Sequence, residues 1–224
     1  MKDVTNWHAC VRPGRTTLAG RYCRLETLDP KRHGDELFAA SMAPGAEERF
    51  RYLLDAPQNR ADFDGWLTWA SASGDPMFFA VVDLASGRCG GRQALMRITS
   101  EHGVIEVGSI LWGPAIARTR VATEALYLFA RYVFDELGYR RFEWKCDARN
   151  EPSKRAAARF GFIYEGAFRQ HMVVKGENRD TAWFSMLDIE WPAIKKSFEQ
   201  WLDPSNFDPL ARQKIRLEDF RKLE

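Results

Sequence analysis

The amino-acid sequence predicts a mixed α/β fold in which helices pack on a mostly antiparallel sheet. In the middle of the chain, three apolar segments of strand length follow one another with only short turns between them, as in a β-meander (residues 77–83, 89–99 and 104–112). After them, helical and strand-like patterns alternate: a helix from about 119 to 137, a strand over 141–147, a helix over 152–160, and two strands over 162–175 and 181–189. A meander followed by such alternation is typical of one sheet with helices packed on it.

The remaining segments complete a one-domain organisation. Residues 1–14 show no period and are expected to form an N-terminal arm. Residues 15–28 suit a strand, and a helix is expected from Pro30 to about Ala43, because proline is favoured at the first helical position. A second helix is expected over 59–73, and a last helix with a charged tail over 191–224. The main domain therefore spans residues 15–190.

The clearest helical signal follows directly after a strand. An apolar stripe precedes Gly138, which ends the helix; it consists of Val121, Ala125, Leu128, Phe129, Tyr132, Val133 and Leu137. The N–H groups of a helix's first turn have no partner inside the helix, and the helix dipole is positive there. Arg118 and Arg120 lie on the turn into this helix. The segment therefore predicts an anion site suited to phosphate.

Composition excludes several classes of function. The chain has 224 residues, 45% of them hydrophobic, enough for a full core. Its 33 basic and 31 acidic residues are too balanced to indicate nucleic acid or an anionic membrane as the main partner. No apolar run reaches the roughly 20 residues of a membrane-spanning helix, and the first residues do not form a signal peptide. The four cysteines and four histidines are scattered, so we expect a cytoplasmic protein with reduced thiols and no metal site.

Several short motifs occur in a characteristic order. They are Glu106-Val-Gly with Leu111-Trp112, then Ala122-Thr-Glu-Ala, then Asn150 with Ser153, then Gly161-Phe162, then Arg169 and Asp180. In this order they resemble the GNAT superfamily of acyl-CoA-dependent N-acyltransferases, in the branch of the ribosomal-protein alanine N-acetyltransferases. The resemblance covers about residues 20–191. It implies a GNAT fold: a mixed, mostly antiparallel central sheet that splays between two parallel strands, at about 104–112 and 140–147, with helices on both faces.

The same resemblance implies that acetyl-CoA binds in the splay. The turn into the long helix would bind the pyrophosphate through Arg118, Thr119, Arg120, Val121, Ala122 and Thr123. The strand residues Ile110, Leu111 and Trp112 would include a bulge whose free N–H polarises the thioester carbonyl. Asn150 would touch the pantetheine arm, although its role as a helix N-cap explains it equally well. The family mostly has glycine where this chain has Arg118 and Arg120, so a loop that no longer binds CoA is the alternative.

Two residues are candidates for the chemistry. An amine that attacks a thioester must lie close to the carbonyl and lose a proton. Glu106 is the best candidate base, directly or through water; the alternative is a solvated strand residue. Ser153 can protonate the departing thiolate or be an ordinary first-turn serine.

Other polar and aromatic residues have simpler interpretations. Glu124 is most simply a first-turn acid favoured by the helix dipole. Arg169 and Asp180 either line the acceptor side or pair with each other across the last hairpin. Periodicity predicts that the tryptophans at 66, 69, 144 and 183 belong to the core.

The expected function is N-acetylation. Acetyl would move from acetyl-CoA to a primary amine, on a protein N-terminus or a small molecule, by direct attack in a ternary complex. A succinyl or other acyl donor, a non-catalytic acyl-CoA-binding module and a protein-interaction domain are the alternatives. The expected partners are acyl-CoA and an amine acceptor, and the arm and tail are compatible with a homodimer.

Overall fold

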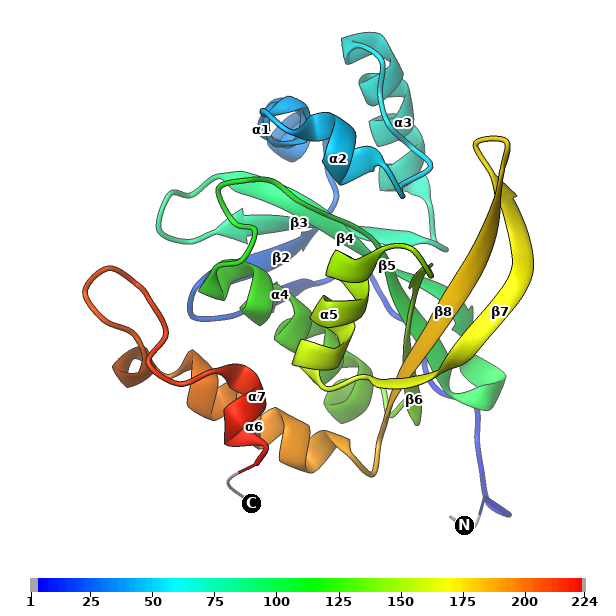
Figure 1. Cartoon of the computed structure of the whole chain (residues 1–224), viewed down its shortest axis with the longest axis vertical. Helices are drawn as coiled ribbons and strands as arrows, with labels where there is room; N and C mark the ends of the chain where they lie inside the picture. The colour runs from blue at the N-terminus through cyan, green and yellow to red at the C-terminus, as the bar shows by residue number, and fades with distance from the viewer. Residues whose placement is uncertain (1–3, 223–224) are drawn as a thin grey trace.

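One mixed sheet organises residues 4–222, the part of the chain that the computed structural model describes. Its eight strands lie in the order β1-β2-β3-β4-β5-β6-β8-β7, and β5–β6 is the parallel pair among antiparallel ones. Figure 1 shows this sheet crossing the molecule. The strands are β1 (Thr17–Ala19), β2 (Cys23–Thr27), β3 (Met77–Asp83), β4 (Cys89–Thr99), β5 (Val104–Trp112), β6 (Arg141–Asp147), β7 (Ile163–Val174) and β8 (Glu177–Leu187).

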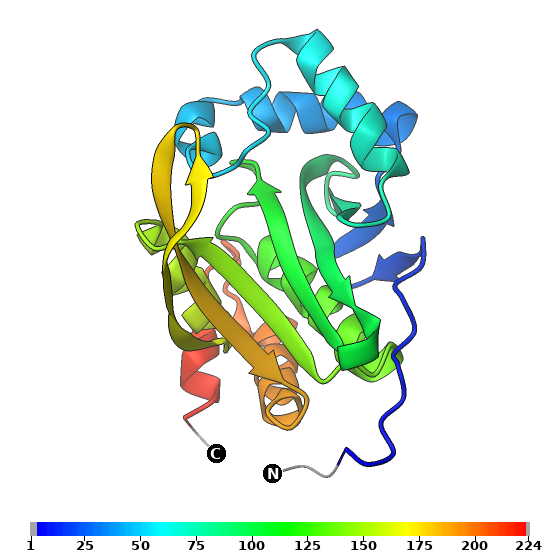
Figure 2. The same ribbon diagram turned by 90° about the vertical axis from the view of Figure 1, so that its right-hand side faces the viewer.

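Helices cover both faces of this sheet. On one face α1 (Pro30–Met42) and α3 (Arg60–Ala72) pack against β4 and β3 (Figure 2). On the other, α4 (Arg120–Arg131) packs against β2 and β3, and α6 (Trp191–Leu202) packs on α4. Strand β3 divides its side chains accordingly, because Phe78 and Ala80 join the core beneath α1 and α3, whereas Phe79 and Val81 join the larger core beneath α4. The predicted fold class is confirmed.

Local boundaries differ from the predicted ones at four places. The strand expected over 15–28 is divided into β1 and β2 by a turn. A short helix, α2 (Ala46–Phe50), follows Gly45, whose φ of +84° allows the chain to reverse after α1. The long helix continues from α4 into a π-helical turn, Tyr132–Glu136. The last hairpin turns at Lys175 and Gly176, so β8 begins earlier than expected.

The remaining short elements lie at turns and in the C-terminal segment. Helix α5 (Glu151–Phe160) lies beside β6 and β7 (Figure 1). Two 3-10 turns and one short helix complete the chain: Ser100–His102, Pro204–Asn206 and α7 (Leu217–Phe220). The Arg221 guanidinium donates to the carbonyl of Arg159, which draws the predicted tail back onto α5. Residues 1–3 of the predicted arm and 223–224 of the predicted tail lie outside the described part.

The sheet opens between its two parallel strands. β5 and β6 pair only from Val104–Arg141 to Val107–Trp144, although both strands continue further. The splay predicted for these strands is therefore confirmed.

Strand β5 also carries the expected bulge. Gly108 pairs with Ala94 and Leu111 with Arg92, so Ser109 and Ile110 together oppose the single residue Gln93. Ser109 has a φ of +46°. Because a bulge leaves one residue outside the ladder, a backbone amide is released at the point where the sheet opens.

Candidate functional site

Two cavities meet at the β5 bulge. The first, which we call the α4 cavity, has a volume of about 730 Å³ and lies among the start of α4, α5 and the C-terminal loop. The second, the β5 cavity, has a volume of about 510 Å³ and lies between β5, β6 and the segment that follows α2. Both are lined by Arg49, Ile110, Trp112 and Ala156. A ligand in one cavity would therefore meet a ligand in the other beside Ile110.

The α4 cavity gathers most of the residues predicted to bind the cofactor. Its walls include Ile110, Leu111, Trp112, Arg118, Thr119, Arg120, Ala122 and Thr123. The side chain of Val121 is instead buried in the core, so only its backbone is left for the turn. The sequence did not indicate the opposite wall, which consists of Arg159 and Phe160 of α5 with Trp201, Phe207 and residues 211–213 of the C-terminal segment.

The turn into α4 keeps a glycine-like backbone without glycine. Arg118 has a φ of +62°, in the left-handed region where a residue other than glycine costs about 1–2 kcal/mol. Thr119 caps the helix: its Oγ1 accepts from the amide of Val121 (3.1 Å) and donates to the carbonyl of Ile116 (2.7 Å). The amides of Arg120 and Ala122 lie in the first turn, which has no helical acceptor for them.

The α4 cavity is strongly cationic. Of residues 4–222, five arginines line it, at positions 49, 118, 120, 159 and 212, and no aspartate or glutamate does. The Arg120 guanidinium lies 4.3 Å from the centroid of the Tyr22 ring, and Arg212 pairs with Asp208 at 2.7 Å. Several guanidinium groups around first-turn amides suit a ligand that carries more than one phosphate.

Arg159 is the most buried of the charged arginines that line the α4 cavity. Its Nη1 donates to Thr123 Oγ1 (3.2 Å), and its guanidinium lies 5.0 Å from the Trp201 ring. Burial lowers the pKa of Arg159, and the charge of Glu218 opposes that shift. Arg159 forms no ion pair with any of residues 4–222. Such a group is available to a phosphate.

Glu106 lies in the β5 cavity as a buried ion-paired carboxylate. It is 2% exposed, and its Oε1 accepts from Arg97 Nη1 at 2.7 Å. Lys145 Nζ lies 2.9 Å from its Oε2 and 2.7 Å from Glu143 Oε2. Burial raises the pKa of Glu106, while Lys145 and Arg97 oppose the rise. The solvated alternative for Glu106 is therefore wrong.

Asn150 and Ser153 also line the β5 cavity. Asn150 caps α5, because its Oδ1 accepts from the amide of Ser153 at 3.1 Å. Ser153 Oγ in turn accepts from the indole of Trp144 at 2.9 Å. Burial raises the pKa of the Cys146 thiol, and a hydrogen bond with Ser153 opposes it. The capping role of Asn150 is confirmed, and its Nδ2 is left for other partners.

A buried arginine supports the bulge from below. Arg92 Nη1 donates to the carbonyl of Ser109 (2.8 Å), and Nη2 donates to Asp55 Oδ2 (2.5 Å). Its guanidinium also lies 4.3 Å from the Trp66 ring. Burial lowers the pKa of Arg92 and Asp55 opposes this shift. The signal in the sequence was a charged residue, Arg92, within the otherwise uncharged first part of a predicted strand, residues 89–96.

The tryptophans divide between core and cavity. Trp144 is buried as predicted. The prediction is wrong for Trp69, which is 53% exposed and lines the β5 cavity with Trp66. Both rings meet Phe78 edge-on, so they form an aromatic wall across from β6.

The hairpin pair lies away from both cavities. Arg169 is exposed on β7, and Asp180 lies on β8. Asp180 Oδ1 accepts from the Gln170 amide (2.7 Å) and from Asn178 Nδ2 (2.9 Å). These two hydrogen bonds lower the pKa of Asp180 more than the charge of Arg169 does. In this structure Asp180 fastens the β7–β8 hairpin.

Glu124 has a role that the sequence did not indicate. It is buried, and its carboxylate accepts from three consecutive backbone amides: Arg21 (2.8 Å), Tyr22 (2.6 Å) and Cys23 (2.7 Å). These amides form the turn between β1 and β2. Glu124 is thus an anchor between α4 and the edge of the sheet, and the interpretation as a simple first-turn acid is wrong.

Residues 4–222 contain neither a cluster of metal-binding side chains nor a helix that could span a membrane. No group of three or more histidine, cysteine, aspartate or glutamate side chains is arranged to hold a metal ion. Within the same range no helix has the length and apolarity required to cross a membrane.

The splayed sheet, the bulge where two cavities meet and the cationic helix start define an acyltransferase of the GNAT fold. Comparison with known proteins agrees: the chain belongs to the GNAT acetyltransferase family, whose acetyltransferase (GNAT) domain model matches residues 24–163.

Solved structures extend the match over most of the chain. A GCN5-related N-acetyltransferase from Brucella melitensis is 59% identical, with a TM-score of 0.95 over 97% of this chain and 99% of that one. A probable GNAT-family acetyltransferase from Chromobacterium violaceum is 38% identical, with a TM-score of 0.79 over 86% and 96%.

A curated relative places the resemblance within the family. The Bacillus subtilis protein named "Putative ribosomal N-acetyltransferase YdaF" is 32% identical over 75 residues, which are 34% of this chain and 41% of that protein. The similarity to the ribosomal-protein N-acetyltransferase branch is confirmed.

Proposed function

We propose that this protein transfers acetyl from acetyl-CoA to a primary amine by direct attack in a ternary complex. The observation that carries the proposal is the junction of the α4 and β5 cavities at the bulge beside Ile110. Two ligands can occupy the two cavities at once and meet there. Direct transfer requires such an arrangement, because both reactants must be held together.

The α4 cavity fits acyl-CoA by its chemistry. Arg118, Arg159 and the first-turn amides of Arg120 and Ala122 would hold phosphates, and Asn150 with Ile110 would hold the pantetheine arm. Bound acetyl-CoA supplies an activated thioester. We assign acetyl as the acyl group because the matching family model describes an acetyltransferase domain and the Brucella melitensis relative is named an N-acetyltransferase.

The chain's own residues provide the remaining functions. A backbone amide released at the bulge would donate to the thioester carbonyl oxygen as that oxygen gains negative charge. Glu106 accepts the proton lost by the amine as the carbon–nitrogen bond forms, directly or through water. Ser153, oriented by Trp144, donates a hydrogen bond to the sulfur as the carbon–sulfur bond breaks, and the departing thiolate takes its proton from water.

Thiol release from acetyl-CoA against a panel of small amines and short peptides tests this proposal, with mass spectrometry of the acetylated product. Faster turnover with succinyl-CoA than with acetyl-CoA would show that succinyl, and not acetyl, is the transferred group. CoA binding in calorimetry without thiol release from any acceptor would show a non-catalytic module. No CoA binding at all would favour a protein-interaction domain.

A further inference from the structure

A third cavity adjoins the β5 cavity. This smaller space, about 170 Å³, lies between the segment after α2 and the β7–β8 hairpin, and we call it the hairpin cavity. It shares Tyr52, Asp147 and Arg179 with the β5 cavity. The three cavities therefore form a series from the α4 turn through the bulge to the hairpin.

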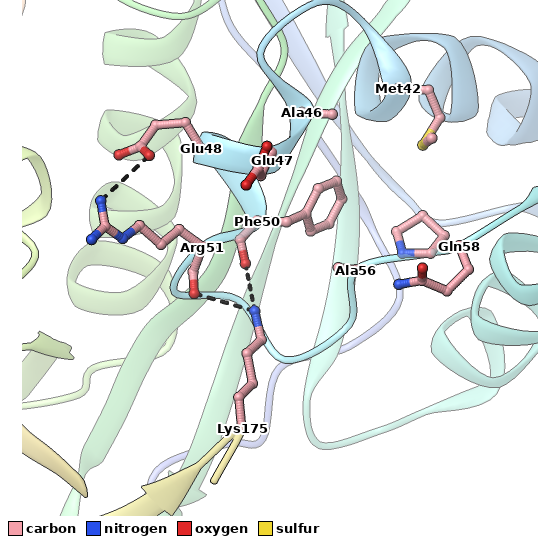
Figure 3. Close-up of a pocket in the computed structure, with 10 residues that line it drawn as sticks. Met42, Ala46, Glu47, Glu48, Phe50, Arg51, Ala56, Gln58 and Lys175 are labelled. Carbon is pink, nitrogen blue, oxygen red and sulfur yellow. Dashed lines mark hydrogen bonds and ion pairs between the residues drawn. The ribbon is translucent and has the colours of Figure 1, made fainter. Parts of the chain in front are cut away.

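Contacts with the segment around the end of α2 hold this passage in shape. Lys175, at the hairpin turn, donates through Nζ to the carbonyls of Phe50 (2.9 Å) and Arg51 (3.2 Å). Figure 3 shows Lys175 extending from the hairpin to these carbonyls. The Tyr52 hydroxyl donates to the carbonyl of Arg149 (3.3 Å). A ligand that extends out of the β5 cavity would pass beneath this bridge.

The hairpin cavity has an excess of positive charge. Its charged lining residues are Arg51, Arg149, Lys175 and Arg179 against Asp147 and Glu177. Arg149 pairs with both acids, with Asp147 at 3.0 Å and with Glu177 at 2.9 Å. Among residues 4–222, Arg179 forms an ion pair with neither acid, although its charge helps to lower the pKa of Asp147.

Arg179 is the cation without a partner. Within residues 4–222 its guanidinium forms no ion pair, and its buried Nε has no hydrogen-bond acceptor. Leaving a buried donor unsatisfied costs about 1–3 kcal/mol, which a ligand oxygen would recover. A guanidinium binds a carboxylate through two parallel hydrogen bonds, so a carboxylate is the ligand that this geometry suits best.

We propose that the acceptor is a peptide N-terminus with an acidic side chain within its first few residues, and that Arg179 binds that carboxylate. This inference rests on the proposed function, since the terminal amine would lie beside Glu106. A chain is favoured over a single amino acid because the β5 and hairpin cavities in series offer more length than one residue occupies. The aromatic wall of Trp66 and Trp69 would contact the side chains between the amine and the carboxylate.

Calorimetry on the CoA-saturated protein tests this without requiring turnover. The probes are tetrapeptide amides that begin with alanine and carry glutamate at the second or third position, each with a glutamine counterpart, and free glutamate. We expect a glutamate peptide to bind about tenfold more tightly than its glutamine counterpart, as one good ion pair provides. Arg179→Gln should remove this preference and leave the glutamine peptide unchanged, whereas Arg179→Lys should keep part of it.

The control is Arg15→Gln, which changes an exposed arginine outside all three cavities and should preserve the preference. Equal binding of the paired peptides, or equal losses for both in Arg179→Gln, would overturn the inference. So would free glutamate binding as tightly as the peptides, because the site would then take a small amino acid. Thiol release by the same peptides is measured separately: a binding preference without any acetylation would refute the proposed function and leave the Arg179 site standing.

Discussion

The Arg92 guanidinium donates a 2.8 Å hydrogen bond to the carbonyl of Ser109, the residue that opens the β5 bulge. Ser109 has a positive φ, which costs a residue other than glycine about 1–3 kcal/mol. The same guanidinium pairs with Asp55 in the segment above the β5 cavity. One buried side chain thus connects the bulge, where the acyl carbonyl is expected, with the segment that covers the acceptor.

Arg92→Met should therefore impair the chemical step. We expect kcat to fall by about 10- to 100-fold, approaching the effect of losing an oxyanion donor, with a smaller change in the KM for acetyl-CoA. Asp55→Asn is the matched variant, because it weakens the pair with Asp55 and keeps the hydrogen bond to Ser109. Steady-state kinetics and thermal unfolding of both variants separate the effects. Equal kcat losses in the two variants would show that Arg92 acts on the covering segment and not on the bulge.

Glu106→Gln should change the pH dependence of the reaction. A protonated carboxyl cannot act as a base, and burial raises the pKa of Glu106 above its usual value of about 4.3. Wild-type kcat/KM should therefore fall as the pH drops through this raised pKa. The Gln variant should lack that decline and turn over more slowly at neutral pH, with a smaller deficit at high pH, where free amine is abundant.

A neighbouring carboxylate gives the control for this measurement. Glu143 is the other partner of Lys145, and it does not line the β5 cavity. Glu143→Gln leaves Lys145 one anionic partner, as Glu106→Gln does. If both variants show the same pH profile as the wild type, Glu106 is not the base.

Local sequence signals predicted the parts of this structure that local forces decide. The stripe of α4 and the cap at Asn150 follow from residue types and spacing within one helix. The splay and the bulge followed from the motif order and not from any single residue. The sequence predicted only one wall of the α4 cavity. Arg159 and residues 211–213 form part of the other wall, and they come from elements that are distant in the sequence.

The errors have a common physical cause. Trp69 has helical spacing on α3, yet the cavity beneath it leaves half of its ring in solvent. Glu124 has the position of an ordinary helix acid, yet its partners lie about a hundred residues earlier in the chain. Periodicity shows on which face of a helix or strand a residue lies. It does not show which other parts of the protein, or whether solvent, that face contacts.

Arg159→Met should weaken acyl-CoA binding. The variant removes a guanidinium that lines the α4 cavity without an ion-pair partner among residues 4–222. We expect a roughly tenfold higher Kd for CoA, about 1.4 kcal/mol, and a weaker dependence on salt, because ionic strength screens one fewer charge. Arg155→Met, one turn earlier on α5 and exposed, is the control. Calorimetry at two salt concentrations compares them, and equal affinities would place the phosphates elsewhere.

Glu124→Gln should lower stability more than a first-turn acid would. The carboxylate satisfies three amides of the β1–β2 turn, and a side chain on Gly20 would lie 2.5 Å from it, so the turn is built closely around this group. A glutamine presents one oxygen and one NH2 group, and the NH2 group would face amide donors. Losing charge-assisted hydrogen bonds at a buried site should reduce the free energy of unfolding by about 2–4 kcal/mol. Urea unfolding measures this, with the exposed Glu151→Gln as control, for which we expect a clearly smaller loss because its pair with Lys154 is solvated. If the two variants lose the same amount of stability, the helix dipole explains the contribution of Glu124. The hydrogen bonds from the β1–β2 turn would then not be its source, because the control variant keeps them.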